Sequence, residues 1–365
     1  MVERLVAAPG CGPSAAAVGI GDAHSDLVTV ARGHGRALDD AGQPMAASSP
    51  LPDEPVFDVG SVTKVAITTA LCMSLVDDRR LRLDAPVARW FPEFASEART
   101  GVTVRDLLEH QAGLWEWWPT YCAGARTAEE ALRVVRELPL RHAPGSGRHY
   151  SDLGFMLLGQ IVSLEYDAPL ADVARDVLLG PLGMAASRYR EPSSAPDDRV
   201  VATSLGDGHE RRMVDSGSPY PVTADSRDFD GWRTRTLVGE ANDGNCWHAF
   251  GGVAGHAGLF TTVPDLLRFG RALLASLAGE GPWSAGVVRQ FCRPGRDPGQ
   301  ALGFRVAAGA AGPVVQHPGF PGCHVGVLPE SARVVVLLTN RLHTPGEPPA
   351  VAGAWSELVE TLEVG

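Results

Sequence analysis

One serine–lysine pair stands out in a chain of 365 residues, because Lys64 is the single lysine among 32 lysine and arginine residues. It follows Ser61 by three positions in the stretch FDVGSVTKVAITTALCM. On a helix this spacing puts the Cβ atoms about 5–6 Å apart, so the amine can reach the hydroxyl. A buried amine can take the proton of a serine, whereas a guanidinium stays protonated. The pair therefore predicts nucleophilic catalysis by Ser61.

The residues around the pair support this interpretation. Gly60 permits a sharp turn into a helix whose first backbone N–H groups would point toward an oxyanion forming at Ser61. A serine and a lysine separated by two residues also occur together by chance, and the pattern alone is weak evidence. Chance is a poorer explanation here, because all the other residues in the lysine and arginine count are arginines.

The pair must be positioned by a buried helix and a sheet. Residues 62–76 are apolar almost all round, which predicts a helix buried on every side. Two β-rich runs, AAAVGIGD and LVTVARGHG, precede it, and four more, ALGFRVAAG, PVVQHPG, CHVGVLPE and ARVVVLLTN, occur in the last third before a terminal helix. We expect an α/β fold in which an antiparallel sheet is built from both ends of the chain and flanked by helices.

The middle of the chain predicts a mainly helical second lobe. Thr127 and Glu130 form a capping-box pattern at a helix start, whereas residues 190–244 are rich in Pro, Ser, Asp and Arg and predict long loops. We expect one lobe from residues 1–74 and 255–365, carrying Ser61, Lys64 and His317, and a helical lobe from 75–254, carrying Tyr150.

Composition excludes several other functions. The net charge of −11 is spread along the chain without an arginine run interleaved with aromatics, so we expect no nucleic-acid or membrane partner. The histidines lack metal-ligand spacing, and HERRM at 209–213 is not a zinc motif, so we expect no metal and no cofactor. Scattered cysteines and the lack of a basic leader with a long apolar run predict free thiols and a cytoplasmic protein.

Six segments in order then resemble the serine β-lactamase-like hydrolases, in the branch of class C β-lactamases, D-alanyl-D-alanine peptidases and esterases. They are SVTK at 61–64, TVRDLLEHQAGL at 103–114, YSDLGFMLLGQIV at 150–162, GGVAGHAGLFTT at 251–262, HPGFPG at 317–322 and VVVLLTNR at 334–341. The resemblance runs nearly end to end and implies the β-lactamase/transpeptidase-like fold.

The resemblance also implies roles for individual residues. Ser61 would be acylated, Lys64 would help to deprotonate it, and Tyr150 would shuttle a proton to the leaving group. The backbone N–H groups of Ser61 and Phe320 would form the oxyanion hole. His317 would hydrogen-bond toward Tyr150 or the substrate; a histidine before Pro-Gly could otherwise be a turn residue. Tyr150 could likewise be a half-buried core tyrosine.

Other matched positions would support the site. Gly319 belongs to the same segment as His317. We expect His256 and the segment 103–114 to be structural supports of the site.

Two departures from the family pattern bear on the substrate. Asp152 stands where many relatives have Asn, and a carboxylate near Lys64 would favour the charged ammonium. Pro318 stands where relatives usually have Thr, which removes a hydroxyl and a backbone N–H that would hold an anionic substrate. Both changes point away from β-lactams and D-alanyl peptides.

We therefore expect a serine hydrolase that acts through an acyl-Ser61 intermediate on a small neutral ester or amide. An acyltransferase that passes the acyl group to an alcohol or amine of a small metabolite would share the first step. A β-lactamase, a D-alanyl-D-alanine peptidase or a binding module without turnover are further alternatives. The sequence does not indicate an oligomeric state.

Overall fold

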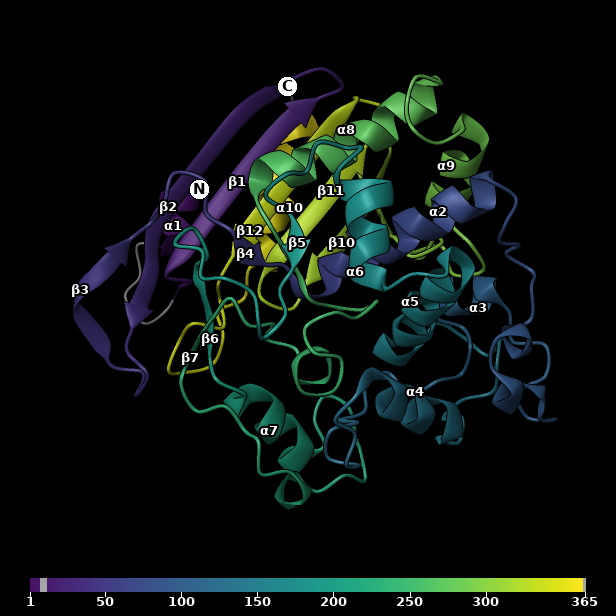
Figure 1. Ribbon diagram of the computed structural model, residues 1–365. Helices are drawn as coiled ribbons and strands as arrows, with labels where there is room; N and C mark the ends of the chain where they lie inside the picture. The colour runs from purple at the N-terminus through teal and green to yellow at the C-terminus, as the bar shows by residue number, and fades with distance from the viewer. Residues whose placement is uncertain (7–11, 364–365) are drawn as a thin grey trace.

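The large sheet combines strands from both ends of the chain, as the sequence predicts. The computed structural model describes residues 1–6 and 12–363. All neighbouring strands of the seven-stranded sheet are antiparallel, in the order β3-β2-β1-β12-β11-β10-β9 (Figure 1). The strands are β1 (Ala15–Asp22), β2 (Asp26–Leu38), β3 (Pro44–Pro50), β9 (Arg305–Ala308), β10 (Pro313–Gly319), β11 (Cys323–Leu328) and β12 (Arg333–Thr339). β3 was not predicted.

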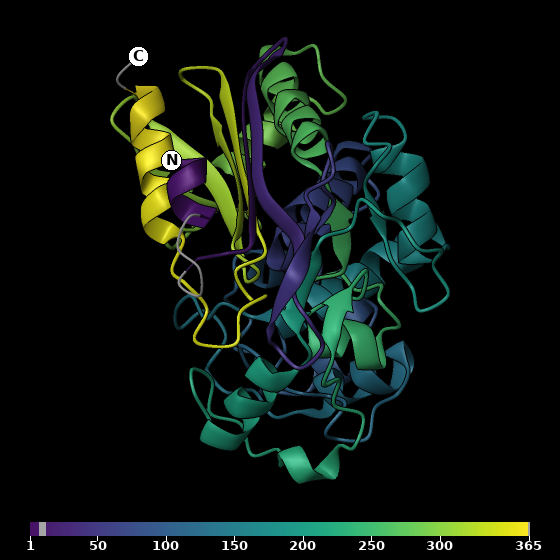
Figure 2. The same cartoon turned by 90° about the vertical axis from the view of Figure 1, so that its left-hand side faces the viewer.

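Helices cover both faces of this sheet. Apolar side chains of α1 (Val2–Val6) and α10 (Ala352–Glu363) pack on one face, and those of α8 (Val263–Ala278) pack on the other (Figure 2). Gly19 of β1 lies so close to α8 that a Cβ there would be 2.2 Å from a methyl of Val263. The central strand β12 is therefore buried from both sides, which explains its nearly continuous apolar sequence.

The remaining elements lie beside this layered unit. The helices are α2 (Ala70–Asp77), α3 (Val104–Leu108), α4 (Ala128–Glu137), α5 (Asp152–Tyr166), α6 (Leu170–Val173), α7 (Gly208–Ser216) and α9 (Ala285–Cys292). The shorter strands are β4 (Phe57–Asp58), β5 (Arg188–Tyr189) and β8 (Leu259–Thr261) in one sheet, and β6 (Ala202–Leu205) and β7 (Thr236–Val238) in another. The fold class is as predicted; the lobe boundaries at 74/75 and 254/255 stay a prediction.

Two predictions of local structure need correction. The buried helix expected over 62–76 is not regular: a 3-10 turn (Gly60–Val62) is followed by a π-helical turn (Lys64–Thr69) and then by α2. The loops expected over 190–244 contain α7, β6 and β7, so part of that region is regular. The capping box is confirmed, because Thr127 and Glu130 bond reciprocally at the start of α4.

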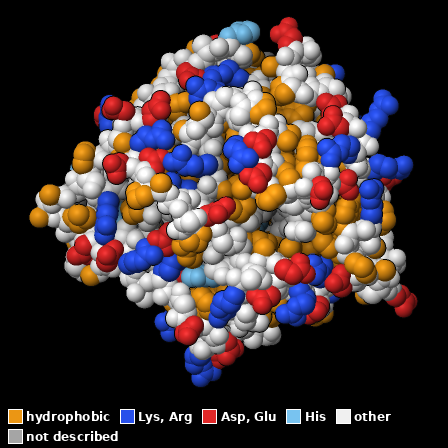
Figure 3. All heavy atoms as spheres, viewed as in Figure 1, with side chains coloured by type: hydrophobic (Ala, Val, Ile, Leu, Met, Phe, Trp, Pro, Cys, Tyr) orange, Lys and Arg blue, Asp and Glu red, His pale blue; other side chains and the backbone are white. Residues whose placement is uncertain are grey.

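Three further features were the subject of sequence predictions: the surface charge, the presence of membrane-spanning helices and the state of the cysteines. On the face seen in Figure 3 charges of both signs are interspersed, without a patch of one sign. None of the helices in the described ranges is long and apolar enough to span a bilayer. The cysteines at 72, 122, 246, 292 and 323 form no disulfide with one another, and Cys11 lies outside the described residues.

Candidate active site

Ser61 lies in the 3-10 turn that joins β4 to the buried helical segment, as the spacing with Lys64 requires. Gly60 before it has φ +49°, and a Cβ at that position would be 2.6 Å from Cδ of Pro321. A side chain at residue 60 would therefore both strain the backbone and collide with the loop after β10. This glycine lets the Ser61 turn and that loop lie against each other.

Lys64 is completely buried, and its ammonium contacts three oxygens. Nζ donates to the Oγ of Ser61 at 2.9 Å and to the backbone carbonyl of His256 at 3.0 Å. It also forms an ion pair with Oδ1 of Asp152 at 2.6 Å, and the Lys64 side chain is 0% exposed. The ammonium thus has an oxygen partner for each of its three protons, which is the condition under which a buried charge is tolerated.

The electrostatics favour the charged form of Lys64. Burial lowers the pKa of the ammonium, but the negative charge of Asp152, together with Tyr150, raises it by more, so the net shift is upward. The expectation that a carboxylate near Lys64 would favour the ammonium is met. In the resting state Lys64 therefore has no free lone pair with which to accept the proton of Ser61.

Asp152 is positioned beside Lys64 by its place in the chain. It is the first residue of the 15-residue helix α5, where the positive end of the helix dipole favours a carboxylate. Ser151 caps the helix by accepting from the backbone N–H of Gly154, and the backbone N–H of Asp152 donates to the carbonyl of Glu116 at 2.8 Å. These bonds hold the carboxylate beside Lys64.

Tyr150 precedes this helix and lies against the same ammonium. The Lys64 Nζ is 5.2 Å from the centre of the tyrosine ring, and the ring of His110 is 4.6 Å away on a tilted plane. Burial raises the pKa of the Tyr150 hydroxyl; the ammonium of Lys64 lowers it, but not enough to reverse the shift. Tyr150 is therefore a neutral phenol in the resting site, able to give a proton and not to accept one.

The end of β10 completes the wall of the site. A Cβ on Gly319 would be 2.1 Å from the carbonyl oxygen of Val59, so strand and turn meet backbone to backbone. The amide nitrogen of Phe320 is 3.4 Å from the point where a Cβ on Gly60 would lie. The two N–H groups proposed for the oxyanion hole, on Ser61 and Phe320, thus come from segments in direct contact.

His317 is fully buried on the same strand. Its Nδ1 donates to the carbonyl of Pro318 at 2.7 Å, while Nε2 has no hydrogen-bond partner among the described residues. Burial and the positive charges of Lys64 and Arg305 hold its pKa well below the usual range, so the ring is neutral. Its centre is 5.9 Å from that of Tyr150. The expected hydrogen bond toward Tyr150 is not formed; the free Nε2 is an acceptor.

Two cavities open on either side of Ser61. The first, of about 220 Å³, is lined by residues that include Trp117, Asp152, Glu210, Met213, Tyr220, Asn242 and Asp243. The second, of about 340 Å³, is lined by residues that include Arg305, Pro318, Gly322, His324 and Arg341. Ser61, Tyr150, Tyr220 and Phe320 border both. Ser61 therefore lies between an acidic, aromatic space and a basic one.

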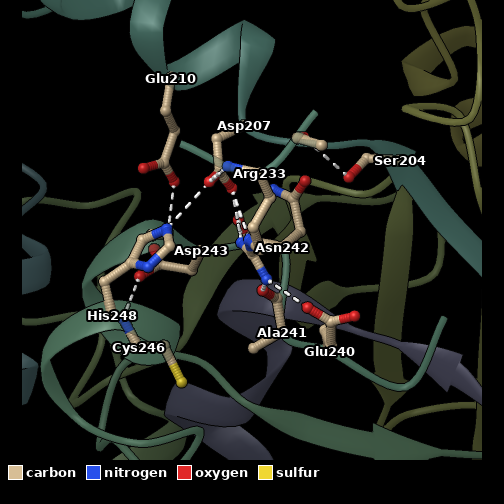
Figure 4. A network of polar contacts seen from close by, with 12 residues as sticks. Ser204, Asp207, Glu210, Arg233, Glu240, Ala241, Asn242, Asp243, Cys246 and His248 are labelled. Atoms are coloured by element: carbon tan, nitrogen blue, oxygen red, sulfur yellow. Dashed lines mark hydrogen bonds and ion pairs between the residues drawn. The ribbon is translucent and has the colours of Figure 1, made fainter. Parts of the chain in front are cut away.

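Most of the cavity residues were missed by reasoning from the sequence. Asn242 and Asp243 lie in a region expected to be loops, which carries no periodic signal. Their segment is held by a buried network in which the Asp207 carboxylate accepts from Arg233 Nε at 2.9 Å and from His248 Nε2 at 2.9 Å (Figure 4). The acidic and basic partners lie 26 and 41 residues apart in the chain. No local pattern joins them.

His256 supports the site in the way the sequence predicts. Its backbone carbonyl accepts from Lys64, and its Nε2 lies 2.9 Å from Oδ1 of Asp243. The ring is completely buried. His256 therefore connects the ammonium of Lys64 to the wall of the first cavity.

A histidine pair outside the site raises the question of a metal. One ligand atom each from Glu116, His142 and His149 lie within 4.8 Å of one another. The two rings are stacked, with centroids 3.4 Å apart and planes at 5°. Lone pairs of parallel rings point in parallel directions and do not converge on one ion. Arg141 also neutralises Glu116 at 2.6 Å, so we propose no metal there.

The fold and this site define a serine hydrolase of the β-lactamase/transpeptidase type. The family model described as Beta-lactamase matches residues 2–359, and the chain belongs to that family. Among curated proteins it is 27% identical over 317 residues to a putative D-alanyl-D-alanine carboxypeptidase of Escherichia coli (strain K12), covering 80% of this chain and 70% of the relative.

Solved structures share the fold across the whole chain. EstCE1, described as a hydrolase with promiscuous acyltransferase activity, has a TM-score of 0.72 and 21% identity, covering 100% of this chain and 97% of that one. A class C beta-lactamase mutant has a TM-score of 0.71 and 15% identity, covering 99% and 95%. At this level of identity the likeness shows the fold alone.

Proposed function

We propose that the protein forms an acyl-Ser61 intermediate from a small ester or amide and passes the acyl group to water. The observation that carries this proposal is the contact of Ser61 Oγ with the buried Lys64 ammonium, itself paired with Asp152, at the border of two open cavities. A serine with a titratable partner at hydrogen-bond distance and space for substrate is the arrangement that covalent catalysis requires.

The protonation states suggest a particular relay. Because Lys64 rests as an ammonium, it must first give a proton to Asp152; the neutral amine then takes the proton of Ser61 as Oγ bonds to the acyl carbon. The N–H groups of Ser61 and Phe320 would stabilise the negative oxygen that forms on that carbon. Tyr150, a neutral phenol, would then protonate the departing group and regain a proton from Lys64.

Hydrolysis and acyl transfer share this first half-reaction. An acyltransferase that uses an alcohol or amine as acceptor is therefore an alternative, and EstCE1 is a protein of this fold to which both activities are ascribed. Exclusion of water from the acyl-enzyme decides between the two outcomes.

A second candidate function is the release of a carboxylate-bearing leaving group, as in a carboxypeptidase. One observation favours it: the buried Nε of Arg305 has no hydrogen-bond partner among the described residues, and its guanidinium lies 5.2 Å over the Tyr150 ring. Arg305 could hold the carboxylate for which Pro318 offers no donor. The curated relatives named as putative carboxypeptidases point the same way.

The test is intact-mass analysis after mixing with p-nitrophenyl acetate and p-nitrophenyl butyrate. We expect an acyl adduct on the wild-type protein and none on Ser61→Ala. Faster nitrophenol release with an added amine or alcohol would identify a transferase, and release of D-alanine from a D-alanyl-D-alanine peptide would identify the carboxypeptidase. An adduct that persists in Ser61→Ala would overturn the proposal, as would no adduct with any of these substrates.

A further inference from the structure

His110 binds the chain on both sides of Tyr150. Its backbone carbonyl accepts from the N–H of His149 at 2.8 Å, and its ring Nδ1 accepts from the N–H of Ser151 at 2.9 Å. The rings of His110 and Tyr150 lie against each other, with their centres 4.6 Å apart. Residues 149–151 belong to no helix or strand, so no regular hydrogen-bond ladder fixes them. One residue therefore holds the backbone before and after Tyr150 and also contacts its side chain.

The backbone of His110 has a conformation that is usual for glycine. The residue follows the short helix α3 and has φ +56°. Its N–H donates to the carbonyl of Leu107 at 3.2 Å, and the N–H of Gln111 donates to that of Asp106 at 2.7 Å. These two bonds form a Schellman motif, whose left-handed position is normally occupied by Gly and sometimes by Asn. The end of α3 would therefore form with less strain if residue 110 were glycine.

The imidazole adds a second cost. Burial, with the positive charge of Lys64, holds the pKa of His110 well below its usual range, so the ring is neutral. Because Nδ1 accepts from Ser151, the single ring proton is on Nε2. That atom has no hydrogen-bond partner among the described residues, although His110 is only 2% exposed. A buried donor without a partner destabilises the folded state.

Neither cost benefits the helix that precedes His110. Strained backbone is found mainly at active sites, where the surrounding structure holds it in place. The bonds that His110 makes beyond its own turn go to the two neighbours of Tyr150 in the chain. It lines neither of the two cavities beside Ser61, so contact with a substrate does not explain it.

Building on the proposed function, we propose that His110 is a positioning residue that holds the Tyr150 phenol where it can protonate the departing group. As the bond from the acyl carbon to the leaving oxygen or nitrogen breaks, its electron pair goes to the leaving atom, which takes the phenolic proton. The phenolate then regains a proton from Lys64. His110 neither gains nor loses a proton in this step and acts only through Tyr150.

Two esters with the same acyl group test the inference. p-Nitrophenyl butyrate releases a stable anion that leaves without a proton, whereas ethyl butyrate releases an alkoxide that needs one. The value of kcat/KM reports the acylation step for both. Displacing a reacting group by about 1 Å can cost about a hundredfold in rate. In His110→Gly we therefore expect the ratio of kcat/KM for ethyl butyrate to that for p-nitrophenyl butyrate to fall at least about tenfold.

This ratio separates positioning from a general structural role. A smaller fraction of folded protein lowers kcat/KM for both esters equally and leaves the ratio unchanged. In a Tyr150→Phe background, His110→Gly should not change the ratio, because the proton donor is already absent. The control is Asp167→Gly, which replaces an exposed residue of φ +53° at the end of α5 and should keep the wild-type ratio.

His110→Asn provides a rescue. Asparagine tolerates the left-handed backbone, and its side-chain oxygen lies about where Nδ1 does, so it can accept from the N–H of Ser151. The ring is lost, so we expect a ratio between those of the wild type and His110→Gly. If His110→Gly does not fold, His110→Asn replaces it in both backgrounds, with the same selective loss expected in smaller measure.

The two proposals fail in different ways. An equal loss of kcat/KM for both esters in the His110 variants, or a selective loss that persists in the Tyr150→Phe background, would overturn the positioning role and leave the acyl-enzyme proposal standing. Absence of any Ser61 adduct when the wild-type protein is mixed with the p-nitrophenyl esters would overturn both.

Discussion

Replacement of Asp152 by asparagine tests the electrostatic description of the site most directly. The substitution keeps the shape of the side chain but removes the charge 2.6 Å from an ammonium that is 0% exposed. Burial lowers the pKa of Lys64, and Asp152 is the first of the groups that raise it. Without that carboxylate the lysine must either stay charged and unpaired or lose its proton. Either way the folded state is destabilised.

The expected loss follows from the cost of each route. Removing one partner of a buried ion pair costs about 3–5 kcal/mol. Deprotonating a lysine of ordinary pKa at pH 7 costs about 4.6 kcal/mol, because each pKa unit is worth about 1.4 kcal/mol. Deprotonation sets an upper limit on the loss, because the lysine gives up its proton when keeping an unpaired charge would cost more. We therefore expect Asp152→Asn to lose about 3–5 kcal/mol of unfolding free energy at pH 7.

The loss should shrink as the pH rises. In the wild type the folded-state pKa of Lys64 is raised, so its stabilising contribution is complete below the unfolded pKa of about 10.4 and constant between pH 7 and 9. In the variant the folded lysine binds fewer protons than the unfolded one, so stability increases with pH. If Lys64 is neutral in the folded variant, two pH units recover about 2–3 kcal/mol.

Urea denaturation followed by circular dichroism at pH 7 and pH 9 measures these differences. Asp84→Asn is the control, because Asp84 is paired with Arg82 at 2.7 Å on the surface and should show little change at either pH. A loss of less than about 1 kcal/mol for Asp152→Asn that does not change with pH would refute the reasoning, because Lys64 would then not depend on Asp152 for its charge.

Three further substitutions test other parts of the site. Lys64→Arg keeps the charge but removes the group that can lose a proton, so ester hydrolysis should fall at least about a hundredfold; near-normal kcat would contradict the relay. Tyr150→Phe removes the proposed proton donor, so amides, with their poor leaving groups, should lose more kcat than p-nitrophenyl esters; equal losses would argue against that role. Gly319→Ala puts a Cβ 2.1 Å from the Val59 carbonyl oxygen and should cost about 1–3 kcal/mol of unfolding free energy and most of the activity. The control is Gly286→Ala, which has no atom within 4 Å of the new Cβ and should be tolerated. Equal melting temperatures of the two variants would contradict the close contact at Gly319.

The parts of the site that the sequence predicted are those set by short-range geometry. Ser61 and Lys64 are three residues apart on one helical segment, and their contact of 2.9 Å agrees with the contact that this spacing predicts. The strands of the last third were found because their alternating or continuous apolar runs are bounded by turns. Yet the periodicity gave no warning of the π-helical turn at Lys64–Thr69, which is decided by packing.

The walls of the cavities depend on contacts that no local pattern encodes. Arg305 lies beside Tyr150 because β9 pairs with β10 in the register that sets Arg305 opposite Gln316. A shift by one residue would turn this side chain to the other face of the sheet, and propensities do not fix such a register. Asn242 and Asp243 reach the site through the network of Asp207 with Arg233 and His248, which joins distant segments. The walls of the two cavities therefore depend on long-range structure, whereas the contact between Ser61 and Lys64 depends on local structure.

The structure changes the interpretation of Lys64 that followed from its being the only lysine in the sequence. A lysine serves as a base in proteins when burial lowers its pKa, but here Asp152 reverses that effect and keeps the ammonium. Arginine also pairs with carboxylates, so the ion pair alone does not explain why a chain that otherwise uses only arginine has a lysine at this position. What arginine lacks is the ability to give up a proton when the substrate changes the local charge. The presence of lysine at this position is what the proposed proton transfer between Ser61 and Asp152 would require.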